Sequence, residues 1–277
     1  MKNVYIMSAN RSAIGGFGGT LKNHCPVDLG TLVAKEAILR SGYEANEVEH
    51  AVFGNVIHTE PRDMYVSRVI ALQAGMDKAS AALTVNRLCG SGLQAIVSAS
   101  QILMLGDASV AMAGGVEVMS NGAHIVQGFR WGSRMGDGEI HDMMLGALHD
   151  PFGHGHMGIT AENISSRYQI SREMQDAFAL TSQKRASEAI KNGAFKDQIL
   201  PIEIKTRKGT EIFETDEHPK PETNIETLSG LRTAFKKDGV VTAGNASGIN
   251  DGASALILAN EEKAKKGAPL ARVVSYG

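Results

Sequence analysis

The stretch LTVNRLCGSGLQAIVSASQILML, residues 83–105, indicates the fold class of this chain. Its first four residues, LTVN, predict a short strand, and residues 91–105 carry small and apolar side chains at helical spacing. Gly90 and Gly92 lie at the junction, where glycine permits a tight turn and a close backbone approach. The stretch therefore predicts a strand, a sharp turn and a buried helix, with Cys89 in the turn.

Strands alternate with helices on both sides of this stretch. We predict further strands over residues 2–9, 48–57, 109–113, 198–206, 255–258 and 271–276, and further helices over 28–40 with Asp28 as the cap, over 64–74 and twice within 160–193. This alternation predicts an α/β fold with a layered, mostly parallel sheet.

A long segment in the middle of the chain interrupts the alternation. Residues 121–160 are rich in Gly, His and Met and have no clear period, and residues 207–240 are charged. A loop-rich stretch of this length inside a compact chain is usually functional or interfacial. We therefore expect an α/β domain formed by residues 1–117 and 245–277, with residues 118–244 as an inserted domain.

Length and composition exclude several classes of protein. The 277 residues are 43% hydrophobic, which is enough for a sizeable core, and the net charge of −2 argues against nucleic-acid or membrane-surface binding. Residues 88–106 carry no charge over nearly the length of a membrane span, but their five Ser and Gln side chains favour the buried helix of a soluble protein. The two cysteines make a disulfide framework or zinc cluster improbable, and the first residues lack a secretory signal, so we expect a cytoplasmic protein.

Cys89 is the first candidate for chemistry. A thiol at the start of a helix faces unpaired backbone N–H groups and the positive end of the helix dipole, and both favour the nucleophilic thiolate. The backbone N–H of Cys89 could also stabilise an oxyanion. The alternative is a small buried apolar side chain, which is the common role of free cysteine and the one we assign to Cys25.

Two other stretches have the composition of a binding site. His154 and His156 lie in a glycine-rich loop and suit either an acid–base role or a turn, and no third ligand has metal-site spacing, so we predict no metal. Residues 241–252, VTAGNASGINDG, suit a loop whose backbone and Ser247 hydroxyl contact an extended ligand, or a turn with internally satisfied side chains. The sequence contains no P-loop, no dinucleotide-binding glycine motif at a strand–helix junction, and no G-x-S-x-G.

Taken together, these segments identify a family. SANRSAIGGFGGTL near the start, NRLCGSGLQA around Cys89, AGGVEVMS at 113–120, HMGITAEN at 156–163 and TAGNASGINDGAS at 242–254 occur in one order over the whole chain. In this order and spacing the chain resembles the thiolase family, and within it the short-chain acetyl-CoA acetyltransferases. The HMG and GNASG segments argue against a ketoacyl synthase, which shares the two-half architecture.

The resemblance implies a reaction. Cys89 would accept an acyl group from acetyl-CoA, and a second acetyl-CoA would attack as an enolate to give acetoacetyl-CoA and CoA, with thiolysis as the reverse. The substrates are coenzyme A thioesters, and no other cofactor is implied. His156 and Met157 would line a pocket for a short acyl group. The resemblance also implies a set of residues that contact CoA: Leu148, Lys220, Phe235, Ala243, Gly244 and Ser247.

The resemblance also implies an oligomer and a missing part. Residues 121–140, including Arg134 to Asp137, resemble the loop that pairs dimers in tetrameric thiolases, so a homodimer or homotetramer is expected. Thiolases consist of two similar α/β halves, and the N-E-A-F, G-H-P and C-x-G-G-G motifs of the second half do not occur in these 277 residues; Glu217-His218-Pro219 is no substitute. We therefore expect a truncated sequence with weak or no condensing activity, or alternatively a non-enzymatic CoA-binding or oligomer-forming remnant.

Overall fold

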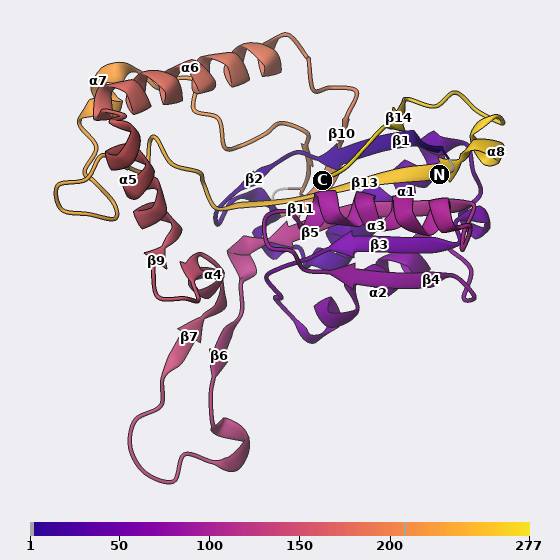
Figure 1. Cartoon of the computed structure of the whole chain (residues 1–277), viewed down its shortest axis with the longest axis horizontal. Helices are drawn as coiled ribbons and strands as arrows, with labels where there is room; N and C mark the ends of the chain where they lie inside the picture. The colour runs from indigo at the N-terminus through magenta and orange to yellow at the C-terminus, as the bar shows by residue number, and fades with distance from the viewer. Residues whose placement is uncertain (1–2, 208) are drawn as a thin grey trace. The chain divides into compact units, whose positions relative to one another are not determined.

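The structure is a computed structural model that describes residues 3–207 and 209–277, and the chain divides into two compact units (Figure 1). Unit 1 comprises Met1–Gly122, Gln198–Thr215 and Asn250–Gly277, and unit 2 comprises Ala123–Asp197 and Asp216–Ile249. Residues 1 and 2 of the predicted first domain, the second of which begins the predicted first strand, and residue 208 of the predicted insertion lie outside the described residues.

The predicted continuous insertion over 118–244 differs from these two compact units in two respects. Residues 198–215 belong to unit 1, because Ile199 and Leu200 pair in parallel with Arg11 and Ser12 of the first strand. The later boundary also lies at 249/250 rather than 244/245, since residues 245–249 cluster with unit 2.

Unit 1 is built on an eight-stranded sheet with the order β10-β1-β13-β5-β3-β4, with β14 beside β1 and β2 beside β13. Its strands are β1 (Val4–Ser12), β2 (Gly15–Gly16), β3 (His50–Gly54), β4 (Ala81–Val85), β5 (Val110–Val118), β10 (Ile199–Leu200), β13 (Asn250–Asn260) and β14 (Ala271–Val273), and its α-helices are α1 (Pro26–Ser41), α2 (Val66–Gln73), α3 (Ser91–Leu105) and α8 (Glu261–Ala264). A separate hairpin joins β11 (Ile202–Thr206) to β12 (Gly209–Phe213).

The prediction of a mostly parallel sheet is wrong, because the sheet is mixed. β3 pairs in parallel with β4 and β5, as strands joined by helical crossovers do. β13 lies between β1 and β5 and is antiparallel to both. β13 follows the segments of unit 2 rather than a crossover helix of the sheet, so the right-handed crossover that enforces parallel pairing does not apply to it.

Helices cover both faces of this sheet. α3 packs through Ala95, Ala99 and Leu103 in one cluster with Ala111 and Ala113 of β5. Side chains alternate along a strand, so Val116 of β5 faces the other side, where it lies close to Gly30 of α1. The predicted helix over 91–105 is confirmed within these bounds.

α3 is not the fully buried helix that its sequence predicts. Leu93 is 73% exposed and Leu105 is 76% exposed, so only the face toward the sheet is covered within this chain. Residues Leu88–Leu105 are also the one described stretch whose helix is long and apolar enough to cross a bilayer. One long face of this apolar helix therefore packs on the sheet, and the opposite face is exposed to solvent.

Two local expectations are also corrected. α1 begins at Pro26 with Cys25 as the N-cap residue, so Asp28 lies in the first helical turn and does not cap the helix. Proline suits the first helical position because its missing N–H would be unpaired there. Pro201 divides the predicted strand 198–206 into β10 and β11, since proline cannot donate to a sheet ladder.

Unit 2 contains short hairpins and helices. Its elements are β6 (His124–Val126), β7 (Ile140–Asp142), α4 (Met143–Ala147), β8 (His149–Asp150), β9 (Gly155–His156), α5 (Met157–Tyr168), α6 (Arg172–Lys191) and α7 (Ile225–Ser229). The Ser171 hydroxyl accepts the Met174 N–H and caps α6, which agrees with the predicted start of the second helix within 160–193.

Candidate functional site

Cys89 lies in a tight turn between β4 and α3. The Ser91 hydroxyl accepts the Arg87 N–H at 2.8 Å and donates to the Leu88 carbonyl at 2.6 Å, and this pair of bonds closes the turn. Leu88 has a φ of 50°, which is uncommon for a non-glycine residue and marks a constrained backbone. Cys89 directly precedes Gly90, the N-cap residue of α3, and is exposed to solvent.

Glycines allow the start of α3 to lie directly on the sheet. A Cβ at Gly54 of β3 would lie 2.7 Å from the backbone carbon of Ser91, and a Cβ at Gly115 of β5 would lie 3.5 Å from the Gly92 Cα. At Gly92 itself nothing lies within 4 Å of the position of a Cβ, so the solvent side of the turn is open. A rigid and accessible thiol at the start of a helix is suited to attack an electrophilic carbonyl.

Cys25 differs from Cys89 in its surroundings. It is partly buried, and burial with the neighbouring Asp28 raises its pKa to about 12. At neutral pH a thiol with this pKa stays protonated and is a poor nucleophile. The two cysteines of the chain are thus chemically distinct.

Four of the residues implied by the family resemblance meet in unit 2. The Met157 N–H donates to the Leu148 carbonyl at 2.8 Å, which joins the ends of the β8–β9 hairpin. The His156 ring stacks on Phe235 at 4.7 Å between ring centroids, and its Nδ1 accepts the Gly158 N–H at 3.0 Å. Leu148, His156, Met157 and Phe235 therefore form one cluster at the start of α5.

His149 completes this cluster and was missed by the sequence analysis. Its ring meets His156 edge-on at 5.1 Å. Burial, and then the charge of His149, lower the pKa of His156. A neutral His156 can stack against Phe235 without the cost of desolvating a charge.

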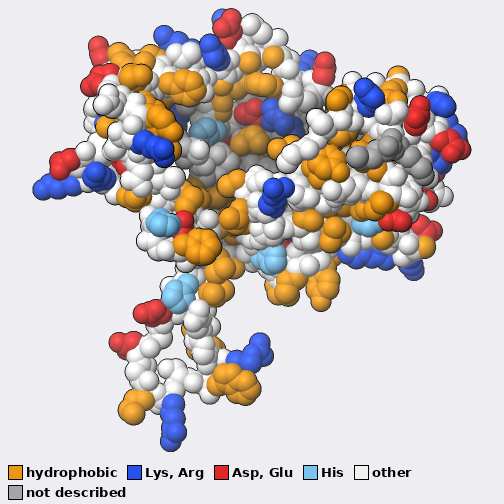
Figure 2. All heavy atoms as spheres, viewed as in Figure 1, with side chains coloured by type: hydrophobic (Ala, Val, Ile, Leu, Met, Phe, Trp, Pro, Cys, Tyr) orange, Lys and Arg blue, Asp and Glu red, His pale blue; other side chains and the backbone are white. Residues whose placement is uncertain are grey.

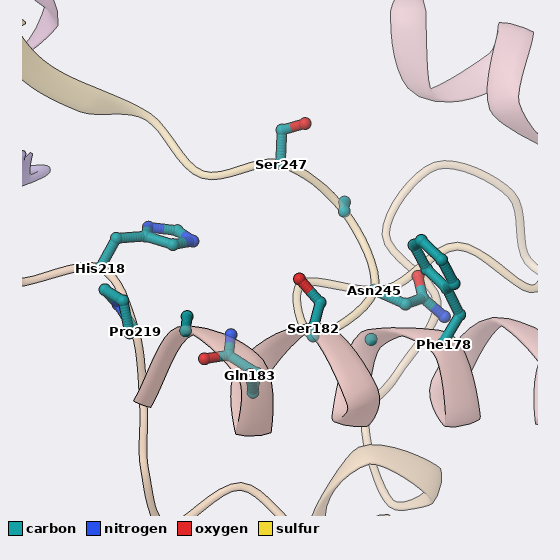
Figure 3. Close-up of a pocket in the computed structure, with 11 residues that line it drawn as sticks. Phe178, Ser182, Gln183, His218, Pro219, Asn245 and Ser247 are labelled. Atoms are coloured by element: carbon teal, nitrogen blue, oxygen red, sulfur yellow. The ribbon is translucent and has the colours of Figure 1, made fainter. Parts of the chain in front are cut away.

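A second part of unit 2 is a cavity of about 340 Å³ beside α6 (Figure 3). The cavity is lined by two of the predicted residues, Gly244 and Ser247, and otherwise by residues that the sequence analysis did not select: Phe178, Ala179, Ser182, Gln183, Ala186, His218, Pro219, Asn245 and Ala246. In Figure 3, α6 lies along one side, the segment that carries Ser247 passes opposite it, and the segment that carries His218 and Pro219 passes one end of the helix.

The remaining predicted residues lie next to this cavity. Ala243 directly precedes Gly244, and the backbone N–H of Lys220 donates to the Gln183 side chain at 2.8 Å. Five cavity residues share one face of α6 at helical spacing, but the same pattern describes any amphipathic helix, so it did not identify a site. An open cavity lined by both apolar side chains and amide, hydroxyl and imidazole groups is suited to a ligand that is partly polar.

The predicted site residues thus fall into three places. Cys89 lies in unit 1, the His156 cluster lies at the start of α5, and the cavity residues lie beside α6 in unit 2. Within the part of the chain that the structure describes, no group of three or more His, Cys, Asp or Glu side chains is arranged as a metal site.

Comparison with known proteins identifies the family. The family model described as "Thiolase, N-terminal domain" matches residues 4–262. The chain belongs to the thiolase family. The resemblance drawn from the motifs around Cys89, His156 and Ser247 is therefore confirmed. Thiolases are acyltransferases.

Thiolases with similar sequences span the whole of this chain. It is 54% identical over 279 residues to a protein named beta-ketothiolase BktB from Cupriavidus necator, covering 100% of this chain and 71% of the relative. It is 46% identical over 281 residues to an acetyl-CoA acetyltransferase from Syntrophomonas wolfei, covering 99% of this chain and 70% of the relative. The chain thus spans about 70% of the length of these thiolases.

Solved thiolase structures confirm the fold. The Bacillus anthracis acetyl-CoA acetyltransferase matches with a TM-score of 0.95 and 47% identity, covering 99% of this chain and 70% of that one. The human mitochondrial 3-ketoacyl-CoA thiolase in complex with CoA matches with a TM-score of 0.94 and 39% identity, covering 99% of this chain and 69% of that one. The chain therefore has the thiolase α/β fold over 99% of its residues.

Proposed function

We propose that the protein is an acetyl-CoA C-acetyltransferase in which Cys89 accepts the acyl group and unit 2 holds the coenzyme A thioester. The main support is the exposed thiol of Cys89 in a constrained turn at the start of α3. The names of the relatives, acetyl-CoA acetyltransferase and beta-ketothiolase, support the same reaction.

The proposed first step is acyl transfer to sulfur. The Cys89 sulfur attacks the thioester carbonyl of acetyl-CoA, a new carbon–sulfur bond forms, and the bond to the coenzyme A sulfur breaks. CoA leaves as a thiol after taking up a proton, and Cys89 keeps the acetyl group. In the second step the α-carbon of another acetyl-CoA, having lost a proton, attacks the carbonyl carbon of the acetyl-cysteine. A carbon–carbon bond forms, the carbon–sulfur bond to Cys89 breaks, Cys89 takes up a proton to become a thiol again, and acetoacetyl-CoA leaves. The two stages predict ping-pong kinetics.

We assign the two parts of unit 2 to different parts of the substrate. The cluster of Leu148, His149, His156, Met157 and Phe235 is apolar apart from its two imidazole rings, and it suits the pantetheine arm and a short acyl group. The cavity beside α6, with Ser247, suits the more polar remainder of CoA. We assign Lys220, whose backbone N–H donates to the Gln183 side chain, as the cation that pairs with a phosphate of CoA.

A second candidate function is binding without turnover. The acid–base motifs expected in a second thiolase half do not occur in these 277 residues. Loss of one such group typically lowers a rate by about 10²–10⁴-fold. On this alternative the chain binds CoA or associates through exposed apolar surface, such as the outer face of α3, without condensing two acetyl groups.

Acylation of Cys89 separates the two candidates. The purified 277-residue protein is incubated with acetyl-CoA and digested, and its cysteine peptides are examined by mass spectrometry, with Cys89→Ser and Cys25→Ser as matched variants. We expect an acetyl adduct on Cys89 that Cys25→Ser retains and Cys89→Ser loses. CoA binding without any adduct on Cys89 would favour the alternative. Steady-state thiolysis of acetoacetyl-CoA then measures whether the second step occurs.

We also propose that the protein forms homo-oligomers in the cytoplasm. The hairpin from β6 to β7 carries exposed apolar side chains with arginines beside them (Figure 2), and Trp131 and Met135 are 89% and 94% exposed. Large exposed apolar side chains of this kind mark association surfaces. Light scattering of the protein and of a Trp131→Glu, Met135→Glu variant tests this, and an unchanged mass would contradict it. The free state of both cysteines supports a reducing compartment.

A further inference from the structure

Two carboxylates that the proposed reaction does not use hold the segment 240–247. Glu162 of α5 is only 4% exposed, and its carboxylate accepts the Val240 and Val241 N–H groups at 3.0 and 2.9 Å. Asp176 of α6 is only 1% exposed and contacts the segment further along. Burial of a carboxylate is costly unless charged or hydrogen-bonded partners compensate, so both contacts need an explanation.

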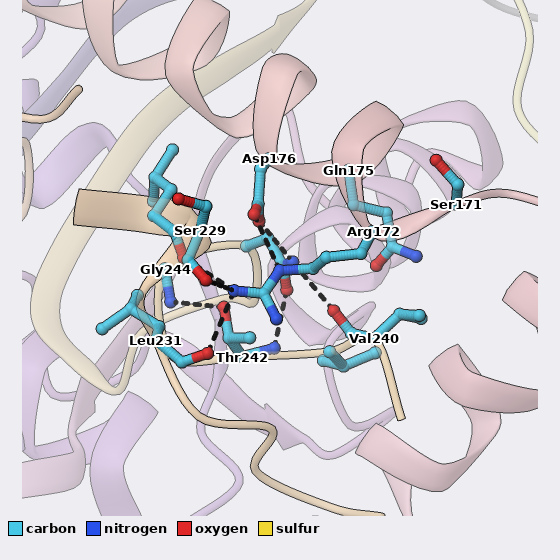
Figure 4. A network of polar contacts seen from close by, with 12 residues as sticks. Ser171, Arg172, Gln175, Asp176, Ser229, Leu231, Val240, Thr242 and Gly244 are labelled. Carbon is cyan, nitrogen blue, oxygen red and sulfur yellow. Dashed lines mark hydrogen bonds and ion pairs between the residues drawn. The ribbon is translucent and has the colours of Figure 1, made fainter. Parts of the chain in front are cut away.

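The Asp176 carboxylate has a different partner on each oxygen (Figure 4). Its Oδ2 accepts Arg172 Nε at 2.7 Å, and its Oδ1 accepts Asn245 Nδ2 at 2.9 Å. The Arg172 guanidinium also donates to the Leu228 and Leu231 carbonyls at 2.7 and 3.0 Å. The pair thus ties α6 both to the turn after α7 and to the segment 240–247.

Asn245 passes this restraint to the backbone of the segment. Its Oδ1 accepts the Thr242 N–H at 2.8 Å, and its Nδ2 also donates to the Val240 carbonyl at 3.0 Å. The Thr242 hydroxyl in turn accepts the Gly244 N–H at 3.2 Å. Each of these bonds fixes a backbone group of the loop, so the shape of the loop depends on the orientation of the Asn245 side chain. The bond from Asn245 to Asp176 sets that orientation.

This loop lines the cavity beside α6, but Asp176 does not. Gly244, Asn245, Ala246 and Ser247 line the cavity, while Asp176 is buried and is not among the lining residues. A change at Asp176 therefore does not remove a contact with a ligand in the cavity, and it reaches the lining through its bond to Asn245. Because Asp176 does not line the cavity, an effect of its substitution on ligand binding would show that it acts through other residues.

We propose that Asp176 is a positioning residue that, through Asn245, holds the 242–247 loop in the shape that receives coenzyme A. The proposal rests on the proposed function, because it takes CoA as the ligand of the cavity. Arg172 balances the charge of the buried carboxylate and fixes its orientation. Both carboxylate oxygens are needed as acceptors, because both facing groups are N–H donors.

Asp176→Asn is the direct perturbation. An asparagine has nearly the same shape, but its amide nitrogen would face either Arg172 Nε or Asn245 Nδ2, and two donors would then oppose each other. Glu173→Gln is the matched control, because Glu173 is an exposed carboxylate in the same helix and is bonded locally to Ser171. Free CoA is the probe, and its Kd is measured by calorimetry with the 277-residue protein at a temperature where each variant is folded.

We expect Asp176→Asn to raise the Kd for CoA about tenfold or more, since an unsatisfied buried group of this kind has an effect of that order. Glu173→Gln should leave it within about twofold. Hydrogen exchange gives a second readout: the Thr242 and Gly244 amides should exchange faster in Asp176→Asn, while the Val240 and Val241 amides, held by Glu162, should keep their wild-type rates. A residue that only stabilises the fold would lower the melting temperature and leave the Kd of the folded protein unchanged.

The two readouts separate the failure of each idea. An unchanged Kd together with unchanged exchange at 242 and 244 would overturn the positioning role. A wild-type protein that does not bind CoA would defeat the proposed function, while faster exchange confined to 242 and 244 would still support the control of the loop by Asp176. If Asp176→Asn does not fold, Asp176→Glu is used, which keeps the charge but displaces it by one methylene, and a smaller change in the same direction is expected.

Discussion

Gly54→Ala tests whether the Cys89 turn depends on the close approach of α3 to the sheet. The added Cβ would lie 2.7 Å from both the backbone carbon and the Cβ of Ser91, and 2.9 Å from its carbonyl oxygen. Two of these three atoms belong to the backbone, so no side-chain rotation relieves the overlap, and the start of α3 must move. Gly54 has no left-handed φ, so alanine introduces no backbone strain of its own.

The expected cost follows from overpacking. Forcing one extra carbon into a well-packed contact costs about 1–3 kcal/mol. A loss of about 2 kcal/mol lowers the melting temperature of a domain of this size by roughly 4–8 °C. Gly92→Ala is the control two residues beyond the N-cap of α3, because nothing lies within 4 Å of its added Cβ, and it should be neutral or stabilising by up to about 1 kcal/mol.

The assay combines urea unfolding with thiol reactivity. The free energy of unfolding is measured for the wild type and both variants, and the rate at which Cys89 reacts with a disulfide reagent reports displacement of the turn. We expect Gly54→Ala to lose stability and to change this rate. Equal stability of Gly54→Ala and Gly92→Ala would refute the reasoning, because it would mean that α3 does not rest on β3 as closely as described.

Three further predictions concern other parts of the chain. Burial raises the pKa of Glu117 from 4.5 to about 7, so the folded protein binds this proton more tightly than the unfolded one. The free energy of unfolding of the wild type, relative to that of Glu117→Gln, should therefore fall as the pH rises from about 4.5 to 7. A difference that does not change with pH would contradict this. At pH 8 a disulfide reagent should modify the exposed Cys89 rapidly and Cys25 slowly, because the pKa of Cys25 is about 12, and Cys89→Ser should remove the fast phase; a fast phase that persists would contradict the assignment. Gly158→Ala should cost about 1–3 kcal/mol and weaken CoA binding, because its Cβ would overlap the Phe235 ring that stacks on His156; calorimetry that finds wild-type affinity would argue against a role for this stack.

Local patterns in the sequence predicted much of unit 1. The β-branched residues within 83–86, the two glycines and the periodic helix that follows are local signals, and the strand, the turn and the helix lie where they were expected. The position of β13 between β1 and β5 could not be predicted in this way, because strand order depends on contacts between residues more than 100 positions apart. For the same reason the sheet was expected to be mostly parallel and is mixed.

In the candidate site, too, some residues could be predicted from the sequence and others only from contacts in the folded chain. The family resemblance implied Leu148, His156, Met157 and Phe235 as site residues, and the structure brings these four together. The carboxylate of Asp176 has no comparable signal, since an acidic residue in an amphipathic helix usually faces solvent. Its role depends on Arg172 and Asn245, and only the folded chain shows that these side chains meet.

The strand order of unit 1 also has a consequence for biosynthesis. β13, which separates β1 from β5, begins at Asn250 and is therefore synthesised only after the 249 residues that precede it. Until it arrives, the facing edges of β1 and β5 have no partner between them, and open strand edges invite pairing with other chains. The sheet of the nascent protein therefore stays incomplete between β1 and β5 until β13 is synthesised. A chaperone that covers these two strand edges during translation would raise the yield of folded molecules.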